Sequence, residues 1–218
     1  MKSKEVFENL ASRYDAWYEG NVGRVAFPEE VECLRPLLAG LPRPHLEVGV
    51  GSGRFAAALG VEVGLDPAYS MLHLARHRGV QVVQGAGERL PFPEETFGAV
   101  LLVVTLCFVD DPLLVLKESA RVLQPGGATL LGLVLQESPW AEAYREKGRR
   151  GHPFYAVAHF YTLQEVEGMV ERARLQMGRC RSALLGKPGQ VTPPKPPMDR
   201  WLPEAGFTCL LAWKQPAR

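Results

Sequence analysis

The chain has 218 residues, 46% hydrophobic and 22% charged, which is the composition of a globular protein rather than a disordered one. With 25 Lys and Arg against 24 Asp and Glu, it lacks the basic excess typical of nucleic-acid-binding proteins. No apolar stretch approaches the roughly 20 residues of a membrane-spanning helix, and the polar N-terminal segment lacks the apolar core of a signal peptide. The cysteines are scattered and form no CxxC pair, which favours reduced thiols in the cytoplasm over disulfides or a metal site: Cys33, Cys107, Cys180 and Cys209.

Residues 1–42 are expected to form an N-terminal helical cap. Apolar residues recur with a helical period over residues 3–19, and glycines at positions 20 and 23 interrupt that period. A second helix is expected to begin near Pro28, with Glu29 and Glu30 in its first turn, and to end at Gly40.

Short apolar runs alternate with helical patterns over residues 43–135. Strands are expected at 45–48, 61–65, 80–83, 100–104 and 129–134, with helices at 54–59, 69–76 and 113–123. This alternation predicts a parallel sheet covered by helices on both faces. Ligands of such sheets bind beyond the carboxyl ends of the strands, which is where a site is expected.

The remaining residues are expected to complete the same domain. Residues 136–175 contain an aromatic and basic segment, an expected substrate lid, and then a helix that starts with a capping box of Thr162 and Glu165. Residues 176–218 are expected to supply strands at 182–185 and 207–213, joined by an exposed, proline-rich loop at 187–200.

A glycine-rich turn after the first strand is the strongest chemical signal. In the string HLEVGVGSGRF, Glu47 precedes Gly49, Gly51 and Gly53, and glycines at such a turn let a ligand lie against bare backbone. The nicotinamide fingerprint G-x-G-x-x-G would need a glycine where Arg54 stands, so a dehydrogenase is the weakest alternative. A carboxylate beside the turn would repel a pyrophosphate but would suit a ligand that carries an ammonium or sulfonium group.

A second acidic residue follows at the end of the next predicted strand. Asp66 stands where a carboxylate can accept hydrogen bonds from both hydroxyls of a ribose. The order and spacing of the turn and this residue fit a β-α-β unit. Together they predict a ligand that contains a nucleoside.

These strings resemble the class I S-adenosylmethionine-dependent methyltransferases, in particular the small-molecule branch similar to ubiquinone and menaquinone biosynthesis methyltransferases. The resemblance rests on VFENLASRYDAWYE, LEVGVGSGRF, GLDPAYSML, VVQGAGERLPFPEETFGAVLLVVTLCFVDDP and LKESARVLQPGG. It implies an α/β Rossmann-like three-layer sandwich with a seven-stranded, mostly parallel sheet and an antiparallel last strand. It also implies that the N-terminal helices form part of a lid and that the cofactor is S-adenosyl-L-methionine.

Carried over to this sequence, the resemblance assigns roles to single residues. Glu47 and the backbone of Gly49 and Gly51 would hold the methionine moiety, Gly53 would pack the turn, and Asp66 would bind the ribose. The other implied cofactor contacts are Pro67, Met71, Ala86 and Gly87 around the adenine, Val103 and Val104 beside the sulfonium, and Tyr14 as a closing side chain. The family usually has Asp where Ala86 stands, so one hydrogen bond to the adenine amino group is lost, with Glu88 as a conceivable substitute. Met71 and Tyr14 have the alternative of packing in the core.

The walls of an acceptor pocket are expected from aromatic residues of the cap and lid, together with one cysteine: Trp17, Tyr18, Cys107, Trp140, Tyr144 and Tyr155. For Cys107 an inert buried thiol is the favoured interpretation, and for His152 and His159 a surface position is favoured over a base. The basic residues Arg145, Lys147, Arg149 and Arg150 are interpreted as a solvated helix face, with binding of an acidic substrate as the alternative.

The sequence therefore predicts a metal-free methyltransferase that transfers a methyl group to a small molecule by in-line displacement. Carbon methylation of a quinone precursor is permitted by the resemblance. The alternative from another class is a protein that binds S-adenosylmethionine without transferring its methyl group, as a sensor or partner subunit.

Overall fold

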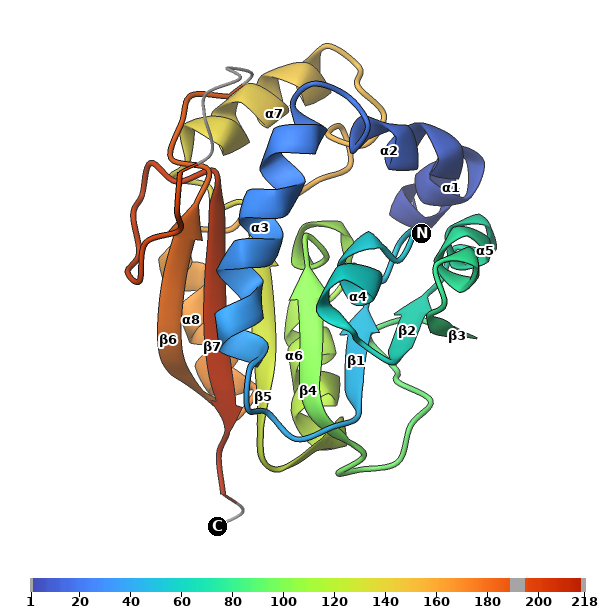
Figure 1. The fold of residues 1–218 in the computed structure, drawn as a ribbon, viewed down its shortest axis with the longest axis vertical. Helices are drawn as coiled ribbons and strands as arrows, with labels where there is room; N and C mark the ends of the chain where they lie inside the picture. Colours follow the sequence, from blue (N-terminus) through green and yellow to red (C-terminus); the bar gives the residue numbers. More distant parts are fainter. Residues whose placement is uncertain (1, 189–194, 217–218) are drawn as a thin grey trace.

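The computed structural model describes residues 2–188 and 195–216, whose strands form one seven-stranded sheet with the order β3-β2-β1-β4-β5-β7-β6 (Figure 1). The strands are β1 (His45–Val48), β2 (Val63–Asp66), β3 (Gln81–Gln84), β4 (Phe97–Val103), β5 (Leu123–Leu133), β6 (Leu175–Ala183) and β7 (Phe207–Lys214). Within these described residues β7 alone runs against the other strands, because it pairs antiparallel with both β5 and β6. The predicted mostly parallel sheet with an antiparallel last strand is confirmed.

Helices cover both faces of the sheet and also its upper edge (Figure 1). One face packs against α3 (Gly23–Leu38), α4 (Arg54–Leu59) and α5 (Tyr69–His77), and the other packs against α6 (Pro112–Val122) and α8 (Leu163–Arg172). Above the carboxyl ends of the parallel strands lie α1 (Lys2–Asn9), α2 (Ala11–Trp17) and α7 (Pro139–Arg149), together with the 3₁₀ turn Leu106–Phe108. The predicted three-layer arrangement with N-terminal helices over the site is confirmed.

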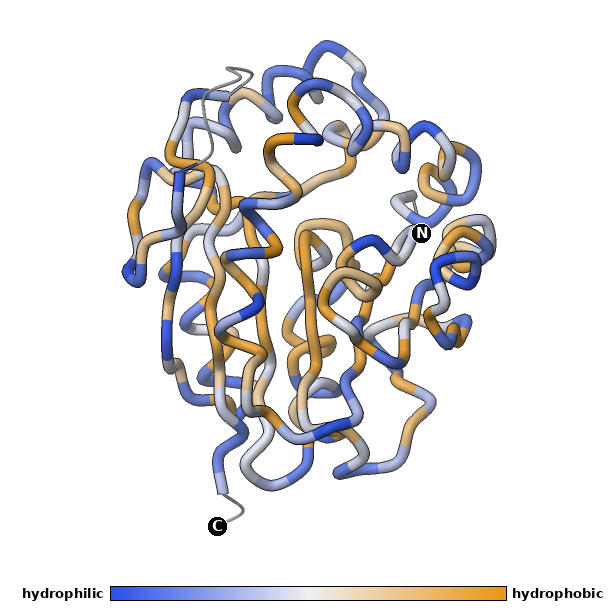
Figure 2. Tube along the Cα trace, in the orientation of Figure 1, coloured by the Kyte–Doolittle hydropathy of each residue, from blue (hydrophilic) through white to orange (hydrophobic). Residues whose placement is uncertain are grey.

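The central strand β4 shows why the sequence forms this layered core. Every residue of Phe97–Val103 is buried, and most of this strand has the hydrophobic colour in Figure 2. Side chains alternate between the two faces, so Leu101 packs with α3 and α4 whereas Leu102 packs with α6 and α8. Burying each such leucine contributes roughly 1.5–3 kcal/mol to folding.

Two of the helix predictions are wrong in detail. The expected single helix over residues 3–19 is two helices, because the backbone at Leu10 leaves the helical conformation at φ −122° and ψ 23°. Helix α3 begins at Gly23 rather than near Pro28, so Pro28 lies inside the helix. Glu29 and Glu30 therefore face the core instead of a solvated first turn, and each is only 7% exposed.

The C-terminal part also departs from the sequence prediction. Strand β6 starts at Leu175, not at residue 182, because its first half is an edge segment with exposed polar side chains and an irregularity between Met177 and Cys180. The segment Pro139–Arg149, for which no helix bounds were predicted, is helical, and Ser138 caps it by accepting a hydrogen bond from the Trp140 N–H. Of the predicted proline-rich loop, residues 189–194 lie outside the described residues, and Met198 forms an isolated bridge with Ser182.

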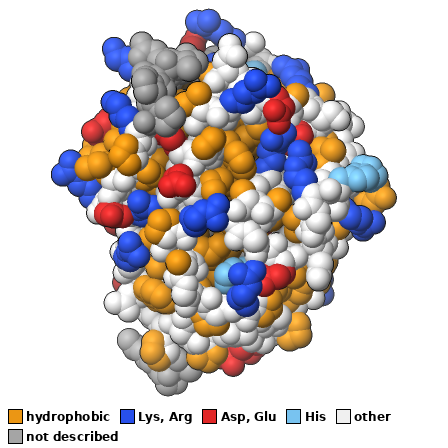
Figure 3. Space-filling model, viewed as in Figure 1, with side chains coloured by type: hydrophobic (Ala, Val, Ile, Leu, Met, Phe, Trp, Pro, Cys, Tyr) orange, Lys and Arg blue, Asp and Glu red, His pale blue; other side chains and the backbone are white. Residues whose placement is uncertain are grey.

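No described helix is long and apolar enough to cross a lipid bilayer. On the face of the molecule seen in Figure 3, basic and acidic side chains are interspersed with uncharged and apolar ones. This surface matches the nearly balanced charge of the sequence.

Candidate functional site

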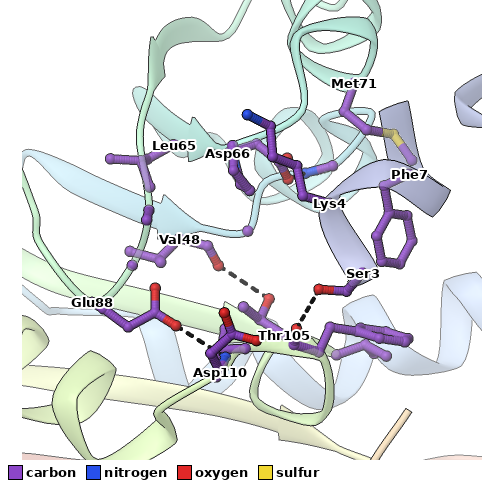
Figure 4. Close-up of a pocket in the computed structure, with 18 of the residues that line it drawn as sticks. Ser3, Lys4, Phe7, Val48, Leu65, Asp66, Met71, Glu88, Thr105 and Asp110 are labelled. Carbon is purple, nitrogen blue, oxygen red and sulfur yellow. Dashed lines mark hydrogen bonds between the residues drawn. The ribbon is translucent and has the colours of Figure 1, made fainter. Parts of the chain in front are cut away.

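A cavity of about 240 Å³ opens at the carboxyl ends of β1, β2 and β4 (Figure 4). It is lined by all but two of the residues that the resemblance assigns to cofactor binding: Tyr14, Gly49, Gly51, Asp66, Pro67, Met71, Ala86, Gly87, Val103 and Val104. The two exceptions, Glu47 and Gly53, lie next to the cavity wall in sequence but are not part of it. The structure thus brings together residues that are up to 90 positions apart, from Tyr14 to Val104.

The glycine turn presents bare backbone to this cavity. Gly49, Gly51 and Gly53 have φ values of 72°, 53° and 80°, a left-handed region that other residues rarely adopt. A Cβ on Gly51 would meet only Tyr14 Cε1, at 3.9 Å, so the space in front of Gly51 is open. A Cβ on Gly53 would lie 2.8 Å from Ala75 Cα, so Gly53 instead lets the start of α4 pack closely against α5.

Asp66 stands at the end of β2 with its carboxylate at the cavity. Gly51 N–H donates to Oδ2 at 3.0 Å, and Ala68 N–H donates to Oδ1 at 2.8 Å. Burial raises the pKa of Asp66 to about 6, although both hydrogen bonds favour the charged form. Each carboxylate oxygen can still accept a further hydrogen bond from a ligand hydroxyl.

Glu47 lies in β1, directly beneath the glycine turn, and is 1% exposed. Its Oε2 has no hydrogen-bond partner among the described residues. Burial raises the pKa of Glu47 well above its usual range, the Asp66 charge adds to that rise, and a hydrogen bond from the Ala56 N–H opposes it. One oxygen of Glu47 therefore accepts a backbone hydrogen bond, as the alternative of a capping role requires. The other oxygen has no donor, and a capping role does not explain it.

Helices α1 and α2 close the cavity from the side of the N-terminus. Phe7, Ser3 and Lys4 approach the cavity in Figure 4, and the Ser3 hydroxyl donates to the Phe108 carbonyl at 2.7 Å. The Phe7 ring packs edge-on against the rings of Tyr14 and Phe108, with centroid separations of 5.3 and 4.9 Å. This cap therefore connects the start of the chain to the loop that follows β4.

An ion-pair network fastens the same cap to the glycine turn. Asp15 Oδ1 accepts from Arg54 Nε at 2.7 Å, and Asp15 Oδ2 accepts from Arg78 Nη2 at 2.8 Å. Arg78 Nη1 also donates to the carbonyl of Ser52, inside the turn. Burial alone would raise the pKa of Asp15, but hydrogen bonds from Arg54, Ser52 and Arg78 outweigh it and lower that pKa to about 2.

Comparisons with known proteins agree with this geometry. A family profile described as "Methyltransferase domain" matches residues 46–131. A solved structure from Thermotoga maritima, described as a SAM-dependent methyltransferase and possible histamine N-methyltransferase, is 31% identical, covers 98% of this chain and 100% of its own, and superposes with a TM-score of 0.89. The chain belongs to the class I S-adenosylmethionine-dependent methyltransferases.

Two sequence relatives complete the comparison. An uncharacterized protein of Mycobacterium tuberculosis is 44% identical over 82% of this chain, which spans only 63% of the length of that relative. A demethylmenaquinone methyltransferase of Corynebacterium kroppenstedtii is 38% identical over 36% of this chain and 34% of its own. The resemblance to menaquinone methyltransferases is therefore real but distant.

At Ala86 the chain departs from the family pattern, and the structure shows what surrounds this position. Ala86, Gly87 and Glu88 all line the cavity. Glu88 Oε1 accepts from the backbone N–H groups of Asp110 and Asp111, at 3.1 and 3.4 Å. Glu88 thus serves first to hold the loop before α6.

The predicted acceptor-pocket residues do not line the main cavity of the described chain; they lie beside it and pack on one another. Tyr14, which does line the cavity, donates or accepts a hydrogen bond with the Tyr18 hydroxyl at 3.2 Å. Tyr144 and Tyr155 stack with centroids 4.3 Å apart. Trp17 packs edge-on against Tyr18, whereas buried Trp140 donates its Nε1–H to the carbonyl of Gly186.

The structure gives no reactive environment to the cysteine, histidine and basic side chains that the sequence singled out. Cys107 is half-buried, its Sγ lies 3.5 Å from the carbonyl oxygen of Val104, and burial raises its thiol pKa to about 12. His152 stacks on Tyr155 at 4.4 Å, and burial lowers its pKa. Arg145, Arg149 and Arg150 pair with Glu142 and Glu146 one helical turn away, as expected of a solvated helix face. Lys147 instead lies over the rings of Tyr144 and Tyr155, 5.6 and 5.8 Å from their centroids.

Several cavity-lining residues were missed by sequence reasoning. Thr105 fills the space behind Gly49, where a Cβ would approach its side chain to 2.5 Å, and its hydroxyl donates to the carbonyl of Val48 at 3.1 Å. Ser3, Lys4 and Phe108 carry no motif of their own. The helical period of residues 3–19 signalled burial of Phe7, but it gave no indication of what Phe7 would contact.

Proposed function

We propose that the chain binds S-adenosylmethionine in this cavity and transfers its methyl group to a small-molecule acceptor. The observation that carries the proposal is the pairing of the Asp66 carboxylate with the open backbone at Gly51, above the unpartnered oxygen of Glu47. A nucleoside that carries a cationic tail complements all three features. The wild-type residues thus fit this cofactor.

The roles of the cavity residues follow from their chemistry. The free acceptor positions of Asp66 would receive the ribose hydroxyls. The buried carboxyl of Glu47, whose raised pKa favours its neutral form in the free protein, would ionise when a cation binds and attract the methionine ammonium across the glycine turn. Pro67 and Met71 would flank the adenine beside Ala86 and Gly87, while Val103 and Val104 would border the sulfonium. Tyr14 would cover the ligand from the cap.

S-adenosylmethionine supplies an activated methyl group on a sulfonium, which is already a good leaving group. The protein then has to hold the accepting atom in line with that methyl group and keep water out, and such positioning can contribute about 7–11 kcal/mol. Phe7, Tyr14 and Phe108 provide an apolar closure for this purpose. No protein nucleophile is needed, in keeping with the raised pKa of Cys107.

Isothermal titration calorimetry with S-adenosylmethionine, S-adenosylhomocysteine and NADH tests the first half of the proposal. We expect micromolar binding of the first two ligands and none of NADH. The double variant Glu47→Gln, Asp66→Asn should weaken binding at least 100-fold, because it removes both carboxyl groups. Glu142→Gln, an exposed carboxyl of α7, is the control and should bind as the wild type does.

Methyl transfer to a panel of amines, phenols and quinone precursors tests the second half. The Thermotoga maritima relative matches along nearly the whole chain and is described as a possible histamine N-methyltransferase, so amines come first in the panel. A methylated product detected by mass spectrometry would support the transferase. Tight cofactor binding without any product would favour a binding protein, and absence of binding to a folded protein would refute both.

A further inference from the structure

The segment that carries Ala86 brings a different carboxyl to the cavity wall. Ala86, Gly87 and Glu88 all line the cavity, but Ala86 is exposed, Gly87 is buried and Glu88 is half-buried. A Cβ on Gly87 would lie 2.9 Å from Val48 Cγ1, so this glycine lets the segment cross the end of β1 at close range. The carboxyl that the segment contributes to the cavity is therefore that of Glu88, two residues beyond the position where the family usually has Asp.

Backbone hydrogen bonds fix both ends of this segment. The Gly85 N–H donates to the carbonyl of Asp66 at 3.2 Å, and the Leu90 N–H donates to Glu118 Oε2 at 2.9 Å. The first of these bonds ties the segment to the end of β2, where Asp66 also presents its carboxylate to the cavity. The distance between the expected ribose contact and Glu88 is thus set by the backbone rather than by flexible side chains.

The Glu88 carboxylate is itself held in one orientation. Its Oε1 accepts from the N–H groups of Asp110 and Asp111, at 3.1 and 3.4 Å (Figure 4). Its Oε2 accepts no hydrogen bond within residues 2–188 and 195–216. Because two donors hold Oε1, the direction of Oε2 is fixed as well. A carboxylate offers acceptors only, so a ligand that meets Oε2 has to bring a donor.

Two other carboxyls line the cavity in the described part of the chain, those of Asp66 and Asp110. Asp66 is oriented at the end of β2 by the N–H groups of Gly51 and Ala68, which suits the ribose. Asp110 comes from the loop before α6, and its backbone supports Glu88. Glu88 alone of the three shares a fixed segment with Ala86 and Gly87, the expected neighbours of the adenine.

We propose that Glu88 recognises the exocyclic amino group of the cofactor's adenine and determines the choice of the base. This inference rests on the proposed function, since it concerns the same cavity and the same ligand. An N–H of the amino group would donate to Glu88 Oε2, as carboxylates accept from amino groups of bases elsewhere. A purine with a carbonyl oxygen at that carbon would bring an acceptor against an acceptor, and both would be left unpaired.

Calorimetry with three ligands that differ only in the base measures this recognition without reference to turnover. They are S-adenosylhomocysteine, its analogue with hydrogen in place of the amino group, and its analogue with a carbonyl oxygen there. We expect the wild type to bind S-adenosylhomocysteine about 10- to 100-fold more tightly than the hydrogen analogue, because one charge-assisted hydrogen bond is lost. The carbonyl analogue should bind more weakly still.

Glu88→Gln separates recognition of the base from support of the loop. The N–H groups of Asp110 and Asp111 should keep the amide oxygen at the place of Oε1, so the amide nitrogen takes the place of Oε2 and presents donors. Binding of S-adenosylhomocysteine should fall about 10-fold or more, and the carbonyl analogue should bind more tightly than to the wild type. The hydrogen analogue should change less than about 3-fold, whereas a purely structural role of Glu88 would weaken all three ligands alike.

Asp110→Asn is the matched variant, because it alters the other carboxyl of this wall and keeps the backbone N–H that Glu88 needs. It should retain the wild-type order of the three ligands. Equal binding of the three ligands to the wild type, an order that survives Glu88→Gln, or one that is lost in Asp110→Asn would overturn the role of Glu88. S-adenosylhomocysteine binding with any of these results would leave the proposed cofactor site standing, whereas a folded protein that binds none of the ligands would refute both proposals.

Discussion

Replacing Asp15 by Asn should weaken the contacts that hold the N-terminal cap to the glycine turn. The free energy of unfolding should therefore fall by a measurable amount. The Asp15 side chain is 17% exposed and accepts hydrogen bonds from Arg54 and Arg78, which are 16% and 27% exposed. These hydrogen bonds lower the folded-state pKa from 3.8 to about 2. At 1.36 kcal/mol per pKa unit, that difference corresponds to roughly 2 kcal/mol of stability at neutral pH.

The sign of the pH dependence follows from the direction of the pKa shift. Because the folded-state pKa lies below the unfolded value, the stabilisation is fully present above about pH 4 and is lost as the pH falls towards 2. Near pH 3 roughly half of it should remain. The Asn variant lacks this titration, so the difference in unfolding free energy between wild type and Asp15→Asn should narrow over the same range.

Urea unfolding followed by tryptophan fluorescence, at pH values from 7 down to 3, measures this difference. Glu142→Gln removes a carboxyl that also pairs with arginines but is 59% exposed, and it should change stability far less. If wild type and Asp15→Asn differ in unfolding free energy by less than about 0.5 kcal/mol at pH 7, the Asp15 ion pairs do not hold the cap in place. A difference that stays constant down to pH 3 would refute this role equally.

The remaining predictions concern the glycine turn and the cavity. Gly53→Ala should cost at least about 2 kcal/mol more in urea unfolding than Gly79→Ala, because both sites have φ near 80° but only Gly53 would place its Cβ against Ala75. Ala86→Asp should tighten S-adenosylmethionine binding about 5-fold in calorimetry, the equivalent of about 1 kcal/mol for one added hydrogen bond; unchanged or weaker binding would count against the adenine position. Since the Asp66 pKa is about 6, the affinity should fall roughly 10-fold from pH 7 to pH 5, and Asp66→Asn should remove that dependence.

The part of the site that the sequence predicts is the part built by local chain geometry. Gly49, Gly51 and Asp66 belong to one β-α-β unit, in which the lengths of the elements place the turn and the second strand end side by side. The hydrogen bond between Gly51 N–H and Asp66 is the direct consequence of this arrangement. Such a unit can be recognised from spacing because few residues separate its parts.

The contacts of the cap could not be predicted, because they join distant parts of the chain. Ser3 binds the carbonyl of Phe108 across 105 positions, and Asp15 binds Arg78 across 63. No sequence pattern around either residue of such a pair indicates which residue it will contact. A helical period shows that a face is buried, but it does not show which surface covers it.

Glu30 shows a second limit of reasoning from residue type. A glutamate after a proline is typical of a solvated first turn of a helix, and that interpretation requires the helix to begin at Pro28. The helix begins five residues earlier, at Gly23, which rotates both glutamates into the core. The position of a single helix start thus decided whether the two carboxyls are surface charges or buried side chains.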